Sequence, residues 1–362
     1  MYKNKKIILF AFATSDLKRS IKRLNDQAIN SNYYSEIKIM TPNNFSNNEK
    51  LKMDHLLKNG KKRGYCYWFW KPLILSKIMK EIQNGDIIHY VDIGCHINKS
   101  KSNRFYEYLD FLIDTNKWLL AFQYHTDNNK FLDSIDFPHR EEFKYTKGDL
   151  LSYFECINEK KITHSPQFWA GSFFIKKDTQ SEKFIEKWIN VFETRFDLID
   201  DTPSITKNFP GFLEHRHDQS VFSLLCKKSF IESLSAYECD WGEKNNLKTW
   251  DHILDHPILA KRDLQYNIFK RFINRQIKNF LYTNITAKTI INAATPCSPK
   301  LLSRLIKFSV TLDPKKATFG PNNISAITDT PNKRTPNSRN LFKYDFIFVI
   351  QIFIFNHPIK NP

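Results

Sequence analysis

The chain has 362 residues, of which 41% are hydrophobic and 15% aromatic, which excludes a disordered protein and provides for one large domain or two ordinary ones. Its formal net charge of +17 calls for an anionic partner, such as nucleic acid, a membrane surface or a phosphate-bearing substrate. Lys and Arg are spread over the whole length and no nucleic-acid-binding motif is present, so we do not expect nucleic acid among the partners.

The cysteines indicate a reducing compartment. All six are far apart in sequence, without a C-x-x-C pair or a disulfide-framework spacing, so we expect free thiols in a cytoplasmic protein. The apolar stretch at residues 7–13 is short and runs into a charged helical pattern without a cleavage site, so it predicts a core strand rather than a signal peptide. No run approaches the roughly 20 apolar residues of a membrane span.

Strands and helices alternate along the first part of the chain. Short apolar runs predict strands, and apolar side chains at helical spacing predict helices between them. This order predicts the α/β class, with a Rossmann-like mixed, mostly parallel sheet and helices on both faces. The predicted strands are residues 7–13, 37–40, 85–92, 118–123 and 168–175; the predicted helices are residues 17–28, 51–57, 73–82, 104–114, 180–196 and 217–226, with a loop at 197–212.

The character of the sequence changes after about residue 262. Residues 263–310 predict a basic amphipathic helix, with apolar side chains on one face and Lys and Arg on the other. Such a helix can pack on the preceding domain or lie on an anionic membrane surface. Residues 311–362 are expected to be a poorly ordered linker and an apolar tail, because much of this segment is rich in Pro, Asn, Ser and Thr. We therefore predict a main domain at residues 1–262 followed by a C-terminal helical and irregular extension.

Residues 63–72 form the first of three clusters that point to chemistry. Aromatic side chains, Trp70 among them, lie between Arg63 and Lys71 just before a predicted helix. Such a segment can stack a base or a sugar ring while the two cations meet phosphates. The alternative is an aromatic plug of the core with solvated cations.

Asp92 ends an apolar strand and is followed by a turn that contains Gly94 and His96. Ligands of open α/β sheets collect at the carboxyl ends of such strands, so Asp92 is placed to meet a metal and a diphosphate, and Gly94 to let the backbone approach them. The alternative is a strand-end aspartate that only caps a turn. Farther along, His256 is another candidate metal ligand, although a single histidine is more often structural.

Residues 214–220, Glu-His-Arg-His-Asp-Gln-Ser, form the third cluster at the start of a predicted helix. Titratable groups at the positive end of a core-facing helix can lie beside a bound ligand, and Asp218 and Gln219 are the candidates. The alternative is a solvated loop in which an aspartate caps the helix. We expect Asp92 and the pair Asp218 and Gln219 to face one pocket across the sheet.

Taken in order, these clusters resemble a known family. The chain is similar to bacterial glycosyltransferases of the GT-A fold, which build capsule, lipopolysaccharide and other surface glycans. The resemblance covers roughly residues 5–265 and rests on the ordered set, since no single motif suffices. The matching segments are Phe-Ala-Thr at 12–14, Gly-Tyr-x-Tyr-Trp-x-Trp-Lys-Pro at 64–72, Gly-Asp-Ile-Ile-x-Tyr-x-Asp-x-Gly-Cys at 85–95, the strand at 167–176 and His-Arg-His-Asp-Gln-Ser at 215–220.

The resemblance implies a GT-A-like sheet that binds a nucleotide-sugar donor, usually a uridine diphosphate sugar, together with a divalent metal, commonly Mn²⁺. In that family an Asp-x-Asp motif supports the metal and the diphosphate. Asp92 matches the first acid, but Gly94 stands at the second, so His96 and His256 are the substitute metal ligands. Donor binding is expected at Ala13, Thr14, Arg63, Trp70, Lys71, Asp92 and Gly94.

The resemblance also implies a role for the third cluster. Asp218 and Gln219 match an Asp-Gln pair that faces the donor sugar and the acceptor in related enzymes, and they are the expected catalytic residues. The expected activity is sugar transfer to a glycan or lipid-linked acceptor in surface-polysaccharide synthesis, by a cytoplasmic protein in peripheral contact with an anionic membrane. Two other interpretations stay open: a nucleotide-sugar hydrolase or pyrophosphatase with the same donor site, and a non-enzymatic basic protein that binds membranes or nucleic acid.

Overall fold

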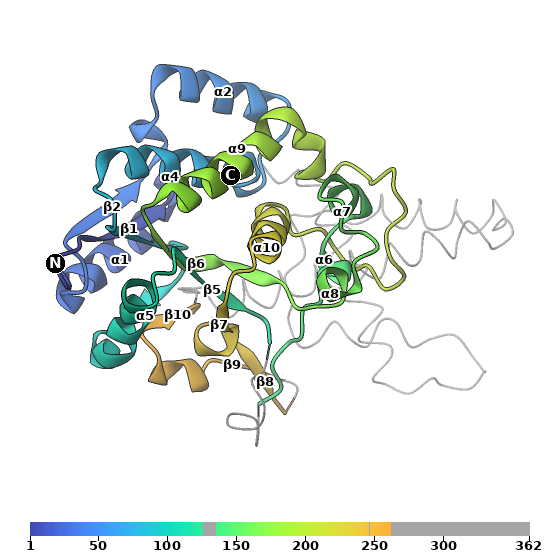
Figure 1. Cartoon of the computed structure of the whole chain (residues 1–362). Helices are drawn as coiled ribbons and strands as arrows, with labels where there is room; N and C mark the ends of the chain where they lie inside the picture. Colours follow the sequence, from blue (N-terminus) through green and yellow to red (C-terminus); the bar gives the residue numbers. More distant parts are fainter. Residues whose placement is uncertain (126–134, 246, 262–362) are drawn as a thin grey trace, which may run out of the picture. The chain divides into compact units, whose positions relative to one another are not determined.

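A six-stranded mixed sheet forms the centre of the computed structural model, which describes residues 1–125, 135–245 and 247–261 (Figure 1). The strand order is β2-β1-β3-β6-β5-β7; β6 runs antiparallel to β3 and β5, and the other neighbouring strands are parallel. The predicted α/β class with a mostly parallel mixed sheet is confirmed. The strands are β1 (Ile7–Phe12), β2 (Glu36–Met40), β3 (Ile87–Val91), β5 (Leu119–Gln123), β6 (Phe168–Lys176) and β7 (Ser233–Ser235).

Helices cover both faces of this sheet, because alternate side chains of each strand point to opposite faces. In β1, Ile8 and Phe10 belong to one apolar cluster, and Ile7 and Leu9 belong to the other. The first cluster is completed by α2, α4, α9 and α10, and the second by α1 and α5. These helices are α1 (Lys18–Ser31), α2 (Asn47–Lys58), α4 (Trp70–Glu81), α5 (Ser102–Asp114), α9 (Thr179–Thr194) and α10 (Asp218–Lys228).

Shorter elements surround the main sheet. Strand β4 (His96–Ile97) pairs with β10 (Ile258–Leu259), and β8 (Gly242–Lys244) pairs with β9 (Leu247–Thr249), in two small antiparallel sheets. The short helices are α3 (Gly64–Tyr67), α6 (Glu142–Tyr145), α7 (Gly148–Tyr153) and α8 (Lys160–Thr163). Single 3₁₀ turns occur at Ser15–Leu17, Pro42–Asn44, Lys99–Lys101, Phe196–Leu198, Ala236–Glu238 and His252–Asp255.

The predicted strands and helices of residues 7–226 are present, with their ends shifted by a few residues. The sequence did not predict α6, α7 and α8, because helices this short show no repeating apolar pattern. The predicted extensions at 263–310 and 311–362, with the basic amphipathic helix, lie outside the described residues. Among the residues that are described, no helix is long and apolar enough to cross a membrane.

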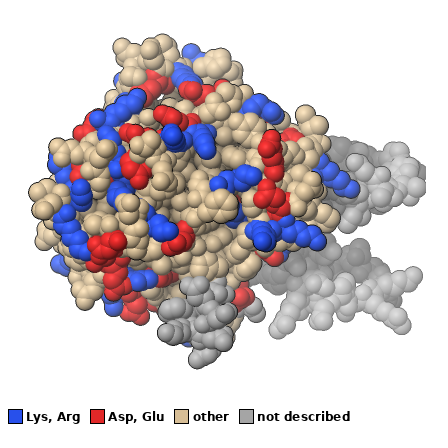
Figure 2. Space-filling view, viewed as in Figure 1, with Lys and Arg blue, Asp and Glu red and all other residues tan. Residues whose placement is uncertain are grey.

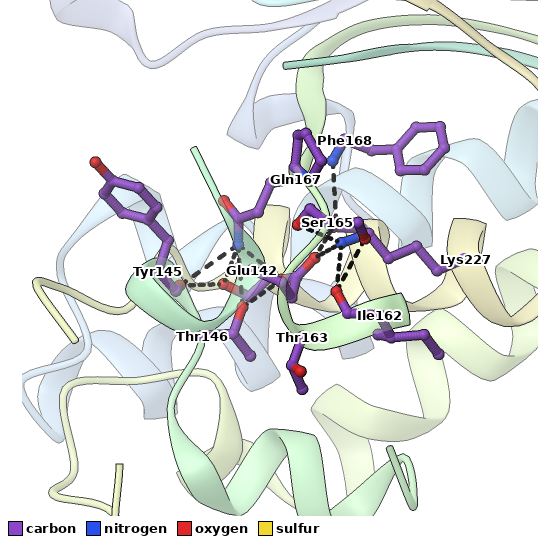
Figure 3. A network of polar contacts seen from close by, with 12 residues as sticks. Glu142, Tyr145, Thr146, Ile162, Thr163, Ser165, Gln167, Phe168 and Lys227 are labelled. Atoms are coloured by element: carbon purple, nitrogen blue, oxygen red, sulfur yellow. Dashed lines mark hydrogen bonds and ion pairs between the residues drawn. The ribbon is translucent and has the colours of Figure 1, made fainter. Parts of the chain in front are cut away.

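A buried ion pair joins Glu142 in α6 to Lys227 in α10 (Figure 3). Lys227 Nζ lies 2.7 Å from Glu142 Oε2, which also accepts a hydrogen bond from the Ser223 hydroxyl (2.5 Å). The other oxygen, Oε1, accepts from Nε2 of Gln167 (2.9 Å), directly before β6. Lys227 donates further to the main-chain carbonyl oxygens of Ile162 in α8 and of Ser165 just after it. The network therefore fixes α10 against α6, α8 and the start of β6.

We expect Lys227→Met to lower the free energy of unfolding by about 3–5 kcal/mol, because it leaves the Glu142 carboxylate buried without its cation. The matched control is Lys228→Met. The pair between Lys228 and Glu159 is exposed, so its loss should change stability by less than about 1 kcal/mol. Urea unfolding of the two variants measures both values, and equal small losses would contradict the proposed importance of the buried pair.

Candidate functional site

Asp92 stands at the carboxyl end of β3. Its N–H still donates to the carbonyl of Gly171 in β6 (2.8 Å), whereas its own carbonyl accepts from the N–H of Cys95 (2.8 Å), so the chain turns here. The hydroxyl of Tyr90, two residues earlier and so on the same side of the strand, donates to Asp92 Oδ1 (2.5 Å). The half-buried carboxylate is therefore held in place at the edge of the sheet.

A second carboxylate, Asp218, forms a buried ion pair with Lys71. Lys71 is the second residue of α4 and Asp218 is the first residue of α10, and Nζ and Oδ2 are 2.5 Å apart. The ammonium group also donates to the carbonyl of Ala170 in β6 (3.0 Å). Lys71 is 2% and Asp218 4% exposed. Since an unpaired buried charge is strongly destabilising, each group depends on the other.

The ion pair and Asp92 belong to one site. Lys71 Nζ lies 4.7 Å from the centre of the Tyr90 ring, whose hydroxyl reaches Asp92. Burial raises the pKa of Asp218 to about 6 against the opposing effect of Lys71, and the negative charge of Asp92 adds to the rise. The fold therefore brings together Lys71, Asp92 and Asp218, one residue from each of the three clusters in the sequence.

Gln219 is fixed by a different set of contacts. Its Nε2 donates to Oε1 of Gln167 (2.9 Å), a fully buried residue. Gln167 in turn donates to Glu142, in the network that Figure 3 shows. The start of α10 is thus held through Asp218 by Lys71 and through Gln219 by the Glu142 network.

Several predicted donor-binding residues gather at the carboxyl end of β1. The Trp70 ring stacks on Phe12, the last residue of β1, with ring centres 4.2 Å apart and an interplanar angle of 20°. Buried Ala13 and half-buried Thr14 follow directly. Since β1 runs parallel to β3, this strand end lies beside the strand that leads to Asp92.

Arg63 and Gly94 are the remaining predicted donor-binding residues. The Arg63 side chain is 51% exposed, and its Nη1 is 3.2 Å from Oδ1 of Asp201, which is also exposed. An exposed pair of this kind is weak, so the guanidinium can exchange Asp201 for an anionic ligand at little cost. Gly94 lies in the half-buried turn between Asp92 and Cys95.

In the structure, the two predicted histidine ligands contact residues other than Asp92. His96 Nδ1 is 3.1 Å from Nε2 of Gln27, and His256 Nδ1 is 3.2 Å from Oε2 of Glu238. Within residues 1–125, 135–245 and 247–261, no three His, Cys, Asp or Glu side chains are grouped so that they could hold a metal ion. These described residues therefore show no preformed site for the predicted divalent metal, and metal binding stays a prediction.

Sequence reasoning did not single out two residues of the site. Tyr90 could have been found, because residues two apart on a strand share a face and Asp92 follows at that spacing. Gln167 carries no local signal, since its partners Gln219 and Glu142 are distant in sequence. The sequence predicts that Lys71 meets phosphates, whereas in the structure its ammonium is paired with the Asp218 carboxylate.

We expect Asp218 to lower stability as the pH rises from about 4 to about 6.5. Its pKa is raised by burial, so in this range the folded protein retains a proton that the unfolded chain has released, and the free energy of unfolding falls with increasing pH. Asp218→Asn removes this contribution. Melting temperatures should therefore shift in favour of the variant, relative to the wild type, as the pH rises. Exposed Asp54, changed to Asn, is the control, and a pH-independent difference for Asp218→Asn would refute the assignment.

Comparisons with known proteins show a likeness in fold at low sequence identity. No family model and no curated protein matches the chain. Among solved structures, a glycosyltransferase involved in the glycosylation of the major capsid of PBCV-1 is 9% identical over 75% of this chain and 99% of its own, with a TM-score of 0.39. The galactosyltransferase LgtC, solved with donor and acceptor sugar analogues, is 14% identical over 65% of this chain and 75% of its own, with a TM-score of 0.34. Mouse xyloside xylosyltransferase 1 is 9% identical over 65% of this chain and 86% of its own, also with a TM-score of 0.34. At these values the matches assign no family.

Proposed function

We propose that the chain transfers a sugar from a nucleotide diphosphate sugar to an acceptor hydroxyl. One observation carries the proposal: Tyr90 connects Asp92 at the end of β3, to which its hydroxyl donates, with the ammonium of Lys71, which is held against Asp218 at the start of α10. These carboxylates lie at the carboxyl edge of a mostly parallel sheet, where α/β proteins bind nucleotide ligands.

The chemistry of glycosyl transfer suits this arrangement. Cleavage of the sugar bond develops positive charge on the sugar ring and negative charge on the departing diphosphate, so carboxylates are needed near the sugar and cations near the phosphates. Asp92 is the more exposed carboxylate, and we assign it to the junction of sugar and diphosphate. Asp218, placed by Lys71, orients the acceptor hydroxyl or stabilises the charged sugar, and Gln219 lies beside it.

The donor nucleotide is assigned to the end of β1. Ala13 and Thr14 follow that strand directly and lie next to β3. Arg63 supplies positive charge for the diphosphate, because its exposed pair with Asp201 opens easily. Trp70 is buried and stacks on Phe12, so it supports this strand end and does not offer its face to a nucleotide base.

The finer identity of donor and acceptor follows the sequence resemblance. We propose a uridine diphosphate sugar as donor, and a glycan or lipid-linked acceptor of surface-polysaccharide synthesis at an anionic membrane. The net charge of +17 suits phosphate-bearing donors and acceptors of this kind. Assays with Mn²⁺ and with a chelator test the predicted metal separately.

We expect Asp92→Ala to reduce sugar transfer by at least about 100-fold, because it removes the carboxylate at the reacting end of the donor. A panel of nucleotide sugars, with glycan and lipid-linked acceptors, identifies the wild-type reaction, and the variant is then compared under the same conditions. Asp54→Asn, at an exposed position of α2, is the control and should keep full activity. An unchanged melting temperature establishes that the Ala variant is folded, and wild-type turnover in it would exclude Asp92 from the mechanism.

The same assays separate sugar transfer from the other interpretations. Free sugar or nucleotide monophosphate released without a glycosylated acceptor would identify a hydrolase or a pyrophosphatase. Absence of turnover, together with no change in melting temperature at millimolar uridine diphosphate and Mn²⁺, would favour a non-enzymatic basic protein.

A further inference from the structure

His217 has a backbone conformation that residues with side chains rarely adopt. Its φ is 52° and its ψ is −121°, and the N–H of Gln219 donates to the carbonyl of Arg216 (3.0 Å). These values describe the second position of a type II′ turn, which glycine normally occupies because a Cβ is strained there. The next residue is Asp218, so the strained turn leads directly to the carboxylate that meets Lys71.

The imidazole of His217 is enclosed by its neighbours. The residue is 1% exposed, and Nδ1 lies 2.6 Å from the carbonyl oxygen of Ile199. The indole of Trp68 stacks on the ring at 5.9 Å and 19°, and the Tyr67 ring meets it edge-on at 5.0 Å and 69°. Strained conformations persist only where the surrounding structure over-determines them, and these contacts do so here.

Tyr67 and Trp68 themselves belong to a left-handed turn. The four residues that end at Trp68 have φ values of 50°, 65°, 54° and 64°, which chains of L-residues seldom adopt in succession. The carbonyl of Trp68 then accepts a hydrogen bond from the N–H of Lys71 (2.9 Å). Each strained segment therefore leads to one member of the ion pair, and the two segments pack against each other at His217.

The chemistry of the His217 ring favours a role in positioning rather than in proton transfer. A carbonyl oxygen can only accept, so Nδ1 carries the proton and Nε2 the lone pair. Burial lowers the pKa of His217, which keeps the ring neutral at neutral pH. Among the residues that the structure describes, Nε2 has no hydrogen-bond partner, and Oδ1 of Asp201 is 3.6 Å away. The ring therefore acts through packing and through its bond to Ile199.

We propose that His217 is the positioning residue of the ion pair between Lys71 and Asp218. Its imidazole, clamped by Ile199 and Trp68, holds the turn before α10 in the strained conformation that places the Asp218 carboxylate against the Lys71 ammonium. That the ion pair serves catalysis rests on the proposed function; that His217 sets its geometry does not.

The test is a double-mutant cycle read by urea unfolding. Lys71→Met, Asp218→Asn and the double variant give the coupling between the two groups, first with His217 present and then with His217→Ala. We expect the coupling, expressed as an equilibrium constant, to fall at least about fivefold when the imidazole is absent. A coupling within about twofold of the parent would overturn the proposal. Because no activity is measured, this outcome is independent of whether the protein transfers sugars.

Two further variants separate the imidazole from the backbone strain. His217→Gly accepts the turn without strain, so it should melt at a higher temperature than His217→Ala; the opposite order would show that the turn is not strained. His217→Asn tolerates positive φ and keeps a side-chain N–H for the Ile199 carbonyl, so it should restore most of the coupling. These melting temperatures also test the proposal if the Lys71 variants fail to fold.

The matched control is His215→Ala. His215 belongs to the same cluster, with its ring 5.3 Å from that of His217 and its Nε2 3.0 Å from the carbonyl oxygen of Leu198, but its φ is not positive. Loss of this imidazole should leave the coupling between Lys71 and Asp218 unchanged. An equal loss in both histidine variants would show that any cavity in this cluster weakens the pair, and it would overturn the specific role of His217.

Discussion

The buried ion pair between Lys71 and Asp218 is the interaction on which the candidate site depends. A lysine in the first turn of α4 faces the positive end of that helix dipole, which is unfavourable for a cation. Asp218 occupies the first turn of α10, where the dipole favours an anion, and it neutralises the lysine at the same point. The carbonyl of Ala170 in β6 accepts another of the ammonium protons. One contact thus joins two helices and the central strand beside Asp92.

A second buried ion pair lies at the C-terminal end of α10, and there the helix contributes the cation instead of the anion. Lys227 lies in the last turn, where the helix dipole favours a cation, and it meets the Glu142 carboxylate. Both ends of one helix are therefore fixed by buried charges, and Gln167 connects Gln219 to the same network. A helix held at both ends has little freedom to shift, so the position of its first residue is well defined for chemistry.

Much of the fold and part of the site could be predicted from the sequence, for identifiable reasons. Asp92 follows an apolar strand and precedes a glycine turn, a local pattern that marks a strand end. Asp218 begins a helix whose apolar face is equally local. The partner of Lys71 could not be predicted, because 147 positions separate it from Asp218 and a cation before a helix suits a phosphate equally well. The contact of His256 with Glu238 could not be predicted either, because no local pattern in the sequence links the two residues.

The long stretch of chain between β3 and its neighbour β6 has a consequence for folding during synthesis. One side of β3 pairs with β1, which is made early, whereas its other side waits for β6, where Ile88 meets Ile175. Until that segment leaves the ribosome, an apolar strand edge has no neighbour, and such edges promote aggregation. Pairing across so long a stretch of chain also slows folding. While the residues between these two strands are translated, the nascent chain therefore exposes an apolar edge that a chaperone can protect from aggregation.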